Sequence, residues 1–354
     1  MKKILLINGS PKGRASNTFR LANAFLKGLN KKKEYEIEEI TCSEVNVNDC
    51  KGCFSCWRNE EGTCAIRDDM SSIFQKYVSA DIVIWSFPNY FYGMPSCAKR
   101  ILDRLLPLYY QNLSSEDGCT TYHLRRYNLK EQNYLLFCAC GLYNTEKNIE
   151  GIKKQFELLY GDACEMLFCS ESQLLSDRFM DYCTAQYLAA LEKEGCKYRE
   201  SFHFSEEIKK LFKRPFLPME EFLSFVDATS VLKTNKMTKE EYAYEKVRAF
   251  FKNMSLTYDA SKLHVENAVL EIEITEFPYR CQLHMNKKNS LLIENKNDFM
   301  PYRLKVISNL SFYVANATLS GETNQKTKQP DFNVLIDLIN KFEKKGITKE
   351  LKFS

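Results

Sequence analysis

The chain lacks an apolar run long enough to cross a membrane, and it lacks a strong net charge. The apolar stretch after Lys3 is only about four residues long, shorter than the apolar region of a secretory signal peptide. We therefore expect no signal peptide, no membrane span and a cytoplasmic location. The net charge is +4 over 354 residues, and Lys and Arg are interspersed with Asp and Glu, so we expect no nucleic-acid partner.

Two nucleotide-binding fingerprints are missing as well. The sequence contains neither Gly-x4-Gly-Lys-Ser/Thr nor Gly-x-Gly-x-x-Gly. The histidines number only four, and His123, His203, His264 and His284 share no motif, so we expect each to be structural or at the surface. The chain therefore offers little acid-base or nucleophilic chemistry of its own.

What the chain does contain is a globular composition and many cysteines. Hydrophobic residues make up 44% and charged residues 27%, and the length predicts about two domains. The 14 cysteines, without a secretory signal, indicate reduced thiols or metal ligands rather than a disulfide framework.

Apolar runs alternate with helical patterns through the first half of the chain. The pattern predicts strands at residues 4–7, 35–40, 81–87, 134–141 and 164–169, and helices at 19–29, 69–78, 94–106, 148–160 and about 177–194. Such alternation predicts a parallel α/β sheet. Residues 109–129 are polar and irregular, and we expect a long loop near the functional edge there, with a disordered insertion as the alternative.

The pattern changes after residue 200. We expect a domain over residues 1–200, a helical linker over 201–238 with Pro215 and Pro218, and a small α+β domain over 239–354. In that second domain the sequence predicts a helix at 239–251, antiparallel strands at 268–274, 279–284 and 290–294, and helices at 299–307 and 334–342.

The loop from Gly9 to Thr18 follows the first strand and precedes the first helix. Backbone N–H groups and the positive end of a helix dipole attract an anion at such a place, and Ser10, Ser16 and Thr18 add hydroxyl groups. The loop therefore predicts a phosphate site. The alternative is an ordinary turn in which Ser16 or Asn17 caps the helix.

Two further loops follow the third and fourth strands. Tyr90, Phe91 and Tyr92 could line a planar heterocycle, while Gly93 and Gly141 permit close approach of the backbone. Ligands of open parallel sheets bind beyond the carboxyl ends of the strands, where these loops lie. Together the three loops predict a flavin site, although each loop alone could simply cover the end of the sheet.

Several of these segments resemble the NADPH-dependent FMN reductase family of flavodoxin-like proteins over roughly residues 1–200. They are Ile7-Asn-Gly-Ser-Pro11, Ser16-Asn-Thr18, Ser86-Phe-Pro-Asn-Tyr90, Met94-Pro95 and Lys99-x3-Asp103-Arg104. The resemblance implies a flavodoxin-like, three-layer, doubly wound sheet of five parallel strands, with FMN as cofactor and NAD(P)H as co-substrate. NAD(P)H can stack on an open flavin face without a Rossmann fingerprint.

The resemblance also implies roles for individual residues. The expected phosphate ligands are Ser10, Arg14, Ser16, Asn17 and Thr18. The expected ring contacts are Pro88, Asn89, Tyr90, Phe91, Tyr92, Gly93, Gly141, Leu142 and Tyr143. Asn89 departs from the usual family sequence and could alter contacts at the edge of the ring.

Four closely spaced cysteines lie on one loop. Cys50, Cys53 and Cys56, followed by Cys64, resemble the compact cluster motif of iron-sulfur flavoproteins, and Asp68-Asp69-Met70 follows them as in related flavin reductases. Four thiolates on one loop can bind a [4Fe-4S] cluster or a tetrahedral zinc ion. Metal-free thiols are the other alternative.

These features predict an FMN-dependent oxidoreductase that passes electrons from NAD(P)H to a quinone, a flavin or another small acceptor. One alternative is an electron carrier that relays electrons between protein partners through FMN and a cluster. Residues 239–354 loosely resemble a sterol-carrier-like domain, which implies a hydrophobic ligand; a dimerisation or substrate-covering module is the alternative. A third interpretation of the whole chain is a hydrophobic-ligand binder whose flavin domain is only a scaffold. The resemblance also implies a homodimer.

Overall fold

The computed structural model describes residues 1–59, 62–115, 118–126, 131–143, 146–176 and 181–220, together with parts of 222–353. The chain forms two compact units. The first contains residues 1–175 and 184–216, and the second contains 176–183 and 217–354. Among the described residues, none of the helices is both long and apolar enough to cross a membrane.

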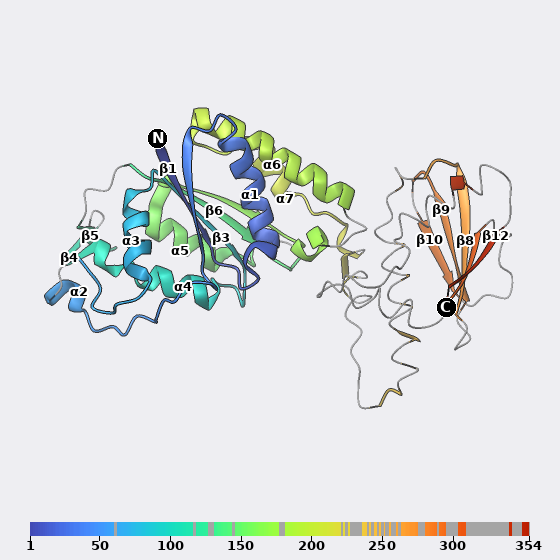
Figure 1. Ribbon diagram of the computed structural model, residues 1–354, viewed down its shortest axis with the longest axis horizontal. Coiled ribbons are helices and arrows are strands. Elements are labelled where there is room, and N and C mark those ends of the chain that lie inside the picture. The colour runs from blue at the N-terminus through green and yellow to red at the C-terminus, as the bar shows by residue number, and fades with distance from the viewer. Residues whose placement is uncertain are drawn as a thin grey trace. The chain divides into compact units, whose positions relative to one another are not determined.

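A five-stranded parallel sheet forms the centre of the first unit (Figure 1). Its strands are β1 (Lys2–Asn8), β2 (Tyr35–Thr41), β3 (Ile82–Pro88), β6 (Asn133–Ala139) and β7 (Cys164–Cys169), in the order β2-β1-β3-β6-β7. The chain moves from β1 to one side and then to the other, so the topological switch point lies between β1 and β3. The flavodoxin-like doubly wound fold predicted from the sequence is confirmed.

Helices cover both faces of this sheet. The helices are α1 (Asn17–Leu29), α2 (Ser55–Arg58), α3 (Met70–Ser79), α4 (Ser96–Asp103), α5 (Glu150–Tyr160), α6 (Asp181–Ser201) and α7 (Glu206–Lys213). In β1, Ile4 and Leu6 pack with α1, α6 and α7, whereas Leu5 and Ile7 pack with α3, α4 and α5. Because successive side chains of a strand point to opposite faces, a continuous apolar run suits a strand covered on both sides.

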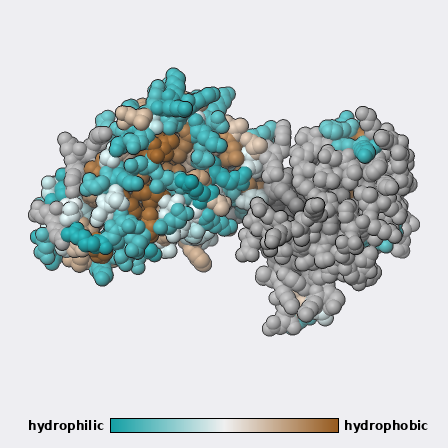
Figure 2. Space-filling model, in the orientation of Figure 1, coloured by the Kyte–Doolittle hydropathy of each residue, from teal (hydrophilic) through white to brown (hydrophobic). Residues whose placement is uncertain are grey.

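Short 3-10 turns connect several of these elements. They span Gly13–Ala15, Leu106–Leu108, Gly161–Ala163 and Ser172–Ser176. Figure 2 shows the visible face of the first unit as mainly hydrophilic, with hydrophobic surface between the hydrophilic residues.

The prediction of an irregular loop at 109–129 was wrong. Strands β4 (Tyr109–Ser114) and β5 (Tyr122–Arg125) form an antiparallel hairpin in this segment. Trp57, which is not part of the hairpin, contacts both of its strands. Its Nε1–H group donates to the Tyr109 carbonyl at 2.9 Å, and its ring packs on His123. These contacts come from a residue far away in the sequence, which explains why local polarity indicated a loop.

Helix α7 lies within the segment that the sequence assigned to a linker. Its Ile208 and Phe212 are 3% exposed and belong to the same core cluster as Phe25. The start of the predicted linker is therefore part of the first unit.

A second five-stranded sheet lies in the second unit. Its strands are β8 (Asn267–Ile274), β9 (Arg280–Asn286), β10 (Ser290–Glu294), β11 (Leu304–Ser308) and β12 (Lys349–Phe353), in the order β10-β9-β8-β11-β12. The antiparallel β8, β9 and β10 confirm three predicted strands. The prediction of a helix at 299–307 was wrong for residues 304–307, because β11 pairs there in parallel with β8 and β12.

Other predictions for the second unit concern segments that are only partly described. Residues 241, 244–245, 248 and 251 are helical, as are Asn340 and Lys341. Residues 299–303 and most of 334–342 lie outside the described residues.

Candidate functional site

The loop after β1 places three buried hydroxyl groups around the start of α1. Ser10 and Thr18 are 1% exposed, and Ser16 is 4% exposed. Ser16 is the N-cap: its Oγ accepts from the Phe19 N–H group at 3.2 Å and from Thr18 Oγ1 at 3.3 Å. The capping role predicted as the alternative is thus real, and it leaves the hydroxyls next to a positive helix end, as a phosphate site requires.

Close packing fixes the position of this loop. A Cβ atom on Gly9 would lie 2.6 Å from Ala98 Cβ and 3.1 Å from Phe87 Cβ. Beneath the loop, Asn8 and Ser86 are register partners on β1 and β3, and both are fully buried. Asn8 Nδ2 and Ser86 Oγ have no hydrogen-bond partner within the described part of the chain. Unused polar atoms beside buried hydroxyls fit an FMN phosphate end at this loop.

Arg14 and Asn17 point to other partners. The Arg14 guanidinium donates two hydrogen bonds to the Glu39 carboxylate, at 2.9 and 3.0 Å, and its side chain is 71% exposed. Hydrogen bonding and the charge of Glu39 raise the pKa of Arg14. Arg14 and Glu39 line a polar cavity of about 370 Å³ at the end of β2. Asn17 Nδ2 donates instead to the Ser172 carbonyl at 2.6 Å.

The loop after β3 ends in a tight, strained turn. Tyr90 and Gly93 exchange two backbone hydrogen bonds, at 3.0 and 2.9 Å. Between them Phe91 and Tyr92 have φ angles of 47° and 62°, in the left-handed region that bulky residues rarely adopt. The turn exposes all three aromatic side chains, with Phe91 fully exposed. Strain of this kind is concentrated at ligand clamps and active sites.

Hydrogen bonds connect the loops after β3 and β6. The Asn89 N–H group donates to the Ala139 carbonyl at 2.7 Å, and Asn89 Nδ2 donates to the Asn148 carbonyl at 2.9 Å. Pro88 ends β3, and its register partner is Ala139 at the end of β6.

The loop after β6 is in turn connected to the loop after β1. The Ser172 N–H group donates to the Cys140 carbonyl at 3.0 Å, and the Ser172 carbonyl holds Asn17. Leu142 is 45% exposed, and its carbonyl accepts from the Glu171 N–H group. The structure therefore brings all three predicted loops, including Gly141 and Tyr143, to one edge of the sheet.

Two positions at this edge were missed in the sequence. Ser172 bridges two loops, and Gln173 Oε1 lies 3.3 Å from the position of a Cβ atom on Gly141. That oxygen is buried and has no partner among the described residues. Both residues follow β7, so the rule that ligands bind beyond the carboxyl ends of strands could have indicated them.

The cysteine loop lies between β2 and α3. Cys50 and Cys53 are exposed, Cys56 is buried and Cys64 is half-buried. Burial raises the pKa of Cys56, and the other three thiols of the loop add to this rise. No three His, Cys, Asp or Glu side chains of the described residues are grouped as metal ligands. The donor set of four neighbouring thiols fits an iron-sulfur cluster, but the side chains are not gathered around one point.

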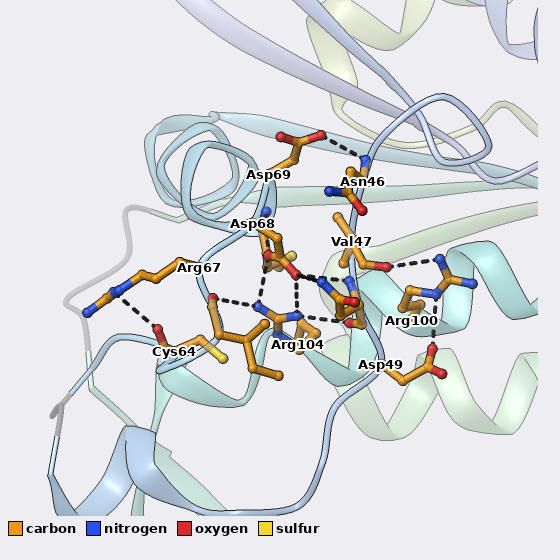
Figure 3. A network of polar contacts seen from close by, with 12 residues as sticks. Asn46, Val47, Asp49, Cys64, Arg67, Asp68, Asp69, Arg100 and Arg104 are labelled. Atoms are coloured by element: carbon orange, nitrogen blue, oxygen red, sulfur yellow. Dashed lines mark hydrogen bonds and ion pairs between the residues drawn. The ribbon is translucent and has the colours of Figure 1, made fainter.

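A buried ion pair closes the base of this loop (Figure 3). Arg104, directly after α4, and Asp68 are each 1% exposed, and their side chains pair at 2.9 Å. Asp68 also accepts from the Asn48 N–H group at 2.9 Å and from Met70 N–H at 3.1 Å. Burial alone would raise the pKa of Asp68, but Arg104 and these N–H groups outweigh burial and lower it well below its usual range.

The two histidines of the first unit have partners outside the three loops. His123 packs on Trp57 beside the cysteine loop, and the exposed His203 pairs with Glu165 at 2.9 Å.

Comparison with known proteins matches part of the first unit to a family model. Residues 2–115 match the model of the family NADPH-dependent FMN reductase, which confirms the resemblance found in the sequence. An iron-sulfur flavoprotein of Archaeoglobus fulgidus is 33% identical over 102 residues, which are 29% of this chain and 48% of that protein. An iron-sulfur flavoprotein of Methanocaldococcus jannaschii is 36% identical over 108 residues, 30% of this chain and 53% of that protein. The chain thus spans about half the length of these relatives.

Solved structures show weaker similarity. An FMN-dependent NADH-azoreductase from Bacillus anthracis, in complex with FMN, is 17% identical and covers 56% of this chain and 100% of its own, with a TM-score of 0.44. An NAD(P)H:quinone oxidoreductase from Methanothermobacter marburgensis is 16% identical. The match covers 58% of this chain and 99% of that protein, with a TM-score of 0.42.

Proposed function

We propose, from the family match of residues 2–115, that the first unit binds FMN and oxidises NAD(P)H, passing the electrons to a quinone, a free flavin or another small acceptor. The observation that supports this most is the meeting of the loops after β1, β3 and β6 at one sheet edge. The Asn17–Ser172 and Asn89–Ala139 hydrogen bonds connect them.

Each loop has a distinct task in this proposal. The hydroxyls of Ser10, Ser16 and Thr18, with the N-terminus of α1, would hold the phosphate. Residues 88–93 and 141–143 would frame the ring. When bound, FMN supplies a two-electron acceptor that a nicotinamide can reduce. The exposed aromatic turn would leave one face of the site open to a flat nicotinamide or quinone.

The test is flavin content followed by turnover of the full chain. Purified protein should show the visible absorption bands of a bound flavin and should oxidise NADH or NADPH with a small quinone or free FMN as acceptor. Ser10→Ala should reduce flavin content, whereas Ser71→Ala, at an exposed position of α3, should not. Protein that stays colourless after FMN is added would contradict the proposal.

A second candidate function is electron transfer between protein partners through FMN and a [4Fe-4S] cluster. Four cysteines on one loop with a fixed base favour it, and the two curated relatives carry the name iron-sulfur flavoprotein. Iron, sulfide and zinc analysis of anaerobically purified protein tests the cluster. Rapid exchange with a ferredoxin-like protein, without steady quinone reduction, would favour the carrier over the enzyme.

The remaining proposals concern assembly and the second domain. A homodimer is proposed from the family resemblance, and sedimentation of the full chain tests it. For residues 239–354 we keep the proposal of a separate domain with a hydrophobic ligand, which organic extraction and mass analysis of the purified chain would detect.

A further inference from the structure

Arg104 reaches both ends of the cysteine loop (Figure 3). One terminal nitrogen donates to the Asn48 carbonyl at 2.8 Å and to Asp68 Oδ2 at 2.9 Å. The other donates to the Ile66 carbonyl at 3.2 Å and to Asp68 Oδ1 at 3.0 Å. Asn48 precedes Cys50, and Ile66 follows Cys64, so one side chain holds the two ends of the loop together.

One donor of Arg104 is left over. A guanidinium has five N–H groups in a fixed plane and stays charged in proteins. Each terminal nitrogen of Arg104 makes two contacts, whereas Nε is buried and has no partner among the described residues. Buried polar groups normally find a partner, and a charged donor most of all. The buried Nε–H group therefore needs a hydrogen-bond acceptor that Asp68, Asn48 and Ile66 do not supply.

Cys64 is the residue placed to supply that acceptor. Arg104 donates to the carbonyl of Ile66, two residues after Cys64, and Figure 3 shows the Cys64 side chain beside this network. A thiolate is a better acceptor than a thiol, and cluster ligands are thiolates.

We propose that the Arg104 Nε–H group donates a hydrogen bond to the Cys64 sulfur when that sulfur is a cluster ligand. Arg104 is then a positioning residue, which orients the fourth cysteine and fixes the base of the loop. The inference rests on the cluster of the second candidate function above and names no new ligand of it.

The ion pair determines what this hydrogen bond does. Asp68 neutralises the charge of Arg104, so the buried pair adds no net charge to the loop and the directional N–H group remains. Hydrogen bonds to cluster sulfurs favour the reduced, more negative form. Arg104 should therefore make the reduction potential of the cluster less negative and slow the loss of iron.

Two lysine variants test this role in the full chain. Arg104→Lys keeps the positive charge beside Asp68 but removes the Nε–H group. Arg100→Lys is the matched control, because Arg100 lies on α4, four residues before Arg104, and contacts the same loop, at the Val47 carbonyl and Asp49. In anaerobically purified protein we expect Arg104→Lys to lose iron to a chelator about tenfold faster and to have a more negative cluster potential. Arg100→Lys should match the wild type, and all three should retain FMN.

A measurement on the unsubstituted chain covers the case in which Arg104→Lys fails to fold. In protein labelled with ¹⁵N-arginine, pulsed paramagnetic resonance of the reduced cluster should detect one coupled guanidinium nitrogen. Iron retention and potential unchanged in Arg104→Lys, or no such coupling, would overturn the role of Arg104 alone. Wild-type protein that holds FMN but no iron would overturn the cluster and this inference together, while leaving the FMN reductase proposal intact.

Discussion

Gly195 of α6 lies directly against the backbone of Phe25 in α1. A Cβ atom on Gly195 would overlap the Phe25 carbonyl oxygen and would lie 2.6 Å from the Leu29 amide nitrogen. Gly28 has the same relationship to the backbone of Glu192. The two helices therefore cross in backbone contact, which fixes α6 over the same face of the sheet as α1.

Gly195→Ala should destabilise the protein. In a helix without this contact, alanine would be favoured over glycine by about 1 kcal/mol. Here the added methyl group meets backbone atoms that cannot rotate away, so we expect a loss of about 3 kcal/mol in the free energy of unfolding. Denaturant unfolding measures it. Lys193→Ala, exposed on the same helix, should change stability by less than about 0.5 kcal/mol. A stabilised Gly195→Ala would show that the helices do not cross this closely.

Asp68 should make stability depend on pH in the acid range. Its pKa is lowered in the folded protein, so its contribution is complete above its unfolded pKa of about 3.9 and is lost as pH falls toward the folded pKa. Between about pH 5 and pH 2, the free energy of unfolding should therefore fall more steeply for the wild type than for Asp68→Asn.

At neutral pH the same variant should be less stable. Asp68→Asn leaves the buried Arg104 charge uncompensated, and we expect a loss of about 3 kcal/mol. Asp103→Asn, which breaks the exposed pair with Lys99, is the control and should have little effect. Parallel pH profiles for Asp68→Asn and the wild type would contradict the assignment.

The sequence predicted the parts of the site that depend on local pattern. A buried apolar run followed by Gly9 and Ser10 indicates a strand and a turn, and the carboxyl ends of parallel strands meet at one edge. For that reason the three loops could be identified without coordinates. The capping role of Ser16 was predicted for the same reason, since the N-cap acts within one turn of its own helix.

Other features depend on partners distant in sequence. The hairpin of β4 and β5 is held by Trp57, and β11 is a strand because β8 and β12 flank it, although its local sequence indicated a helix. The pairing of Arg14 with Glu39 brings together residues 25 positions apart. Arg104 belongs to the motif Lys99-x3-Asp103-Arg104, but its position between the ends of the cysteine loop follows only from the fold.

Gly9→Ala should weaken FMN binding by displacing the phosphate loop. The new methyl group would lie 2.6 Å from Ala98 Cβ on α4, so the loop must move. We expect at least a roughly tenfold higher dissociation constant in a fluorescence titration with FMN. Ala98→Gly removes the opposing methyl group, and the double variant should recover most of the affinity. If the double variant binds as poorly as Gly9→Ala, the clash with α4 is not the cause.

Glu39→Gln should release Arg14 for an anion at the phosphate loop. Glu39 accepts both Arg14 hydrogen bonds, and neutralising it removes the charge that holds the guanidinium at the end of β2. Because the pair is exposed, we expect only a roughly two- to fivefold tighter binding of FMN, and the gain should shrink with added salt. Arg14→Ala in the same background should abolish the gain. An unchanged affinity would indicate that Arg14 takes no part in phosphate binding.

The turn at Phe91 and Tyr92 should trade stability for ligand binding. Tyr92 has a φ angle of 62°, which glycine adopts without strain, so Tyr92→Gly should stabilise flavin-free protein by about 1 kcal/mol. The same change removes an aromatic side chain that is 62% exposed at the site, and FMN should then bind roughly tenfold more weakly.

Lys33→Gly is the matched control, because Lys33 also has a positive φ angle but lies in the turn before β2. It should give a similar stability gain in denaturant unfolding and no change in the flavin titration. A Tyr92→Gly variant with unchanged affinity for FMN would mean that the strain at this turn does not serve the flavin.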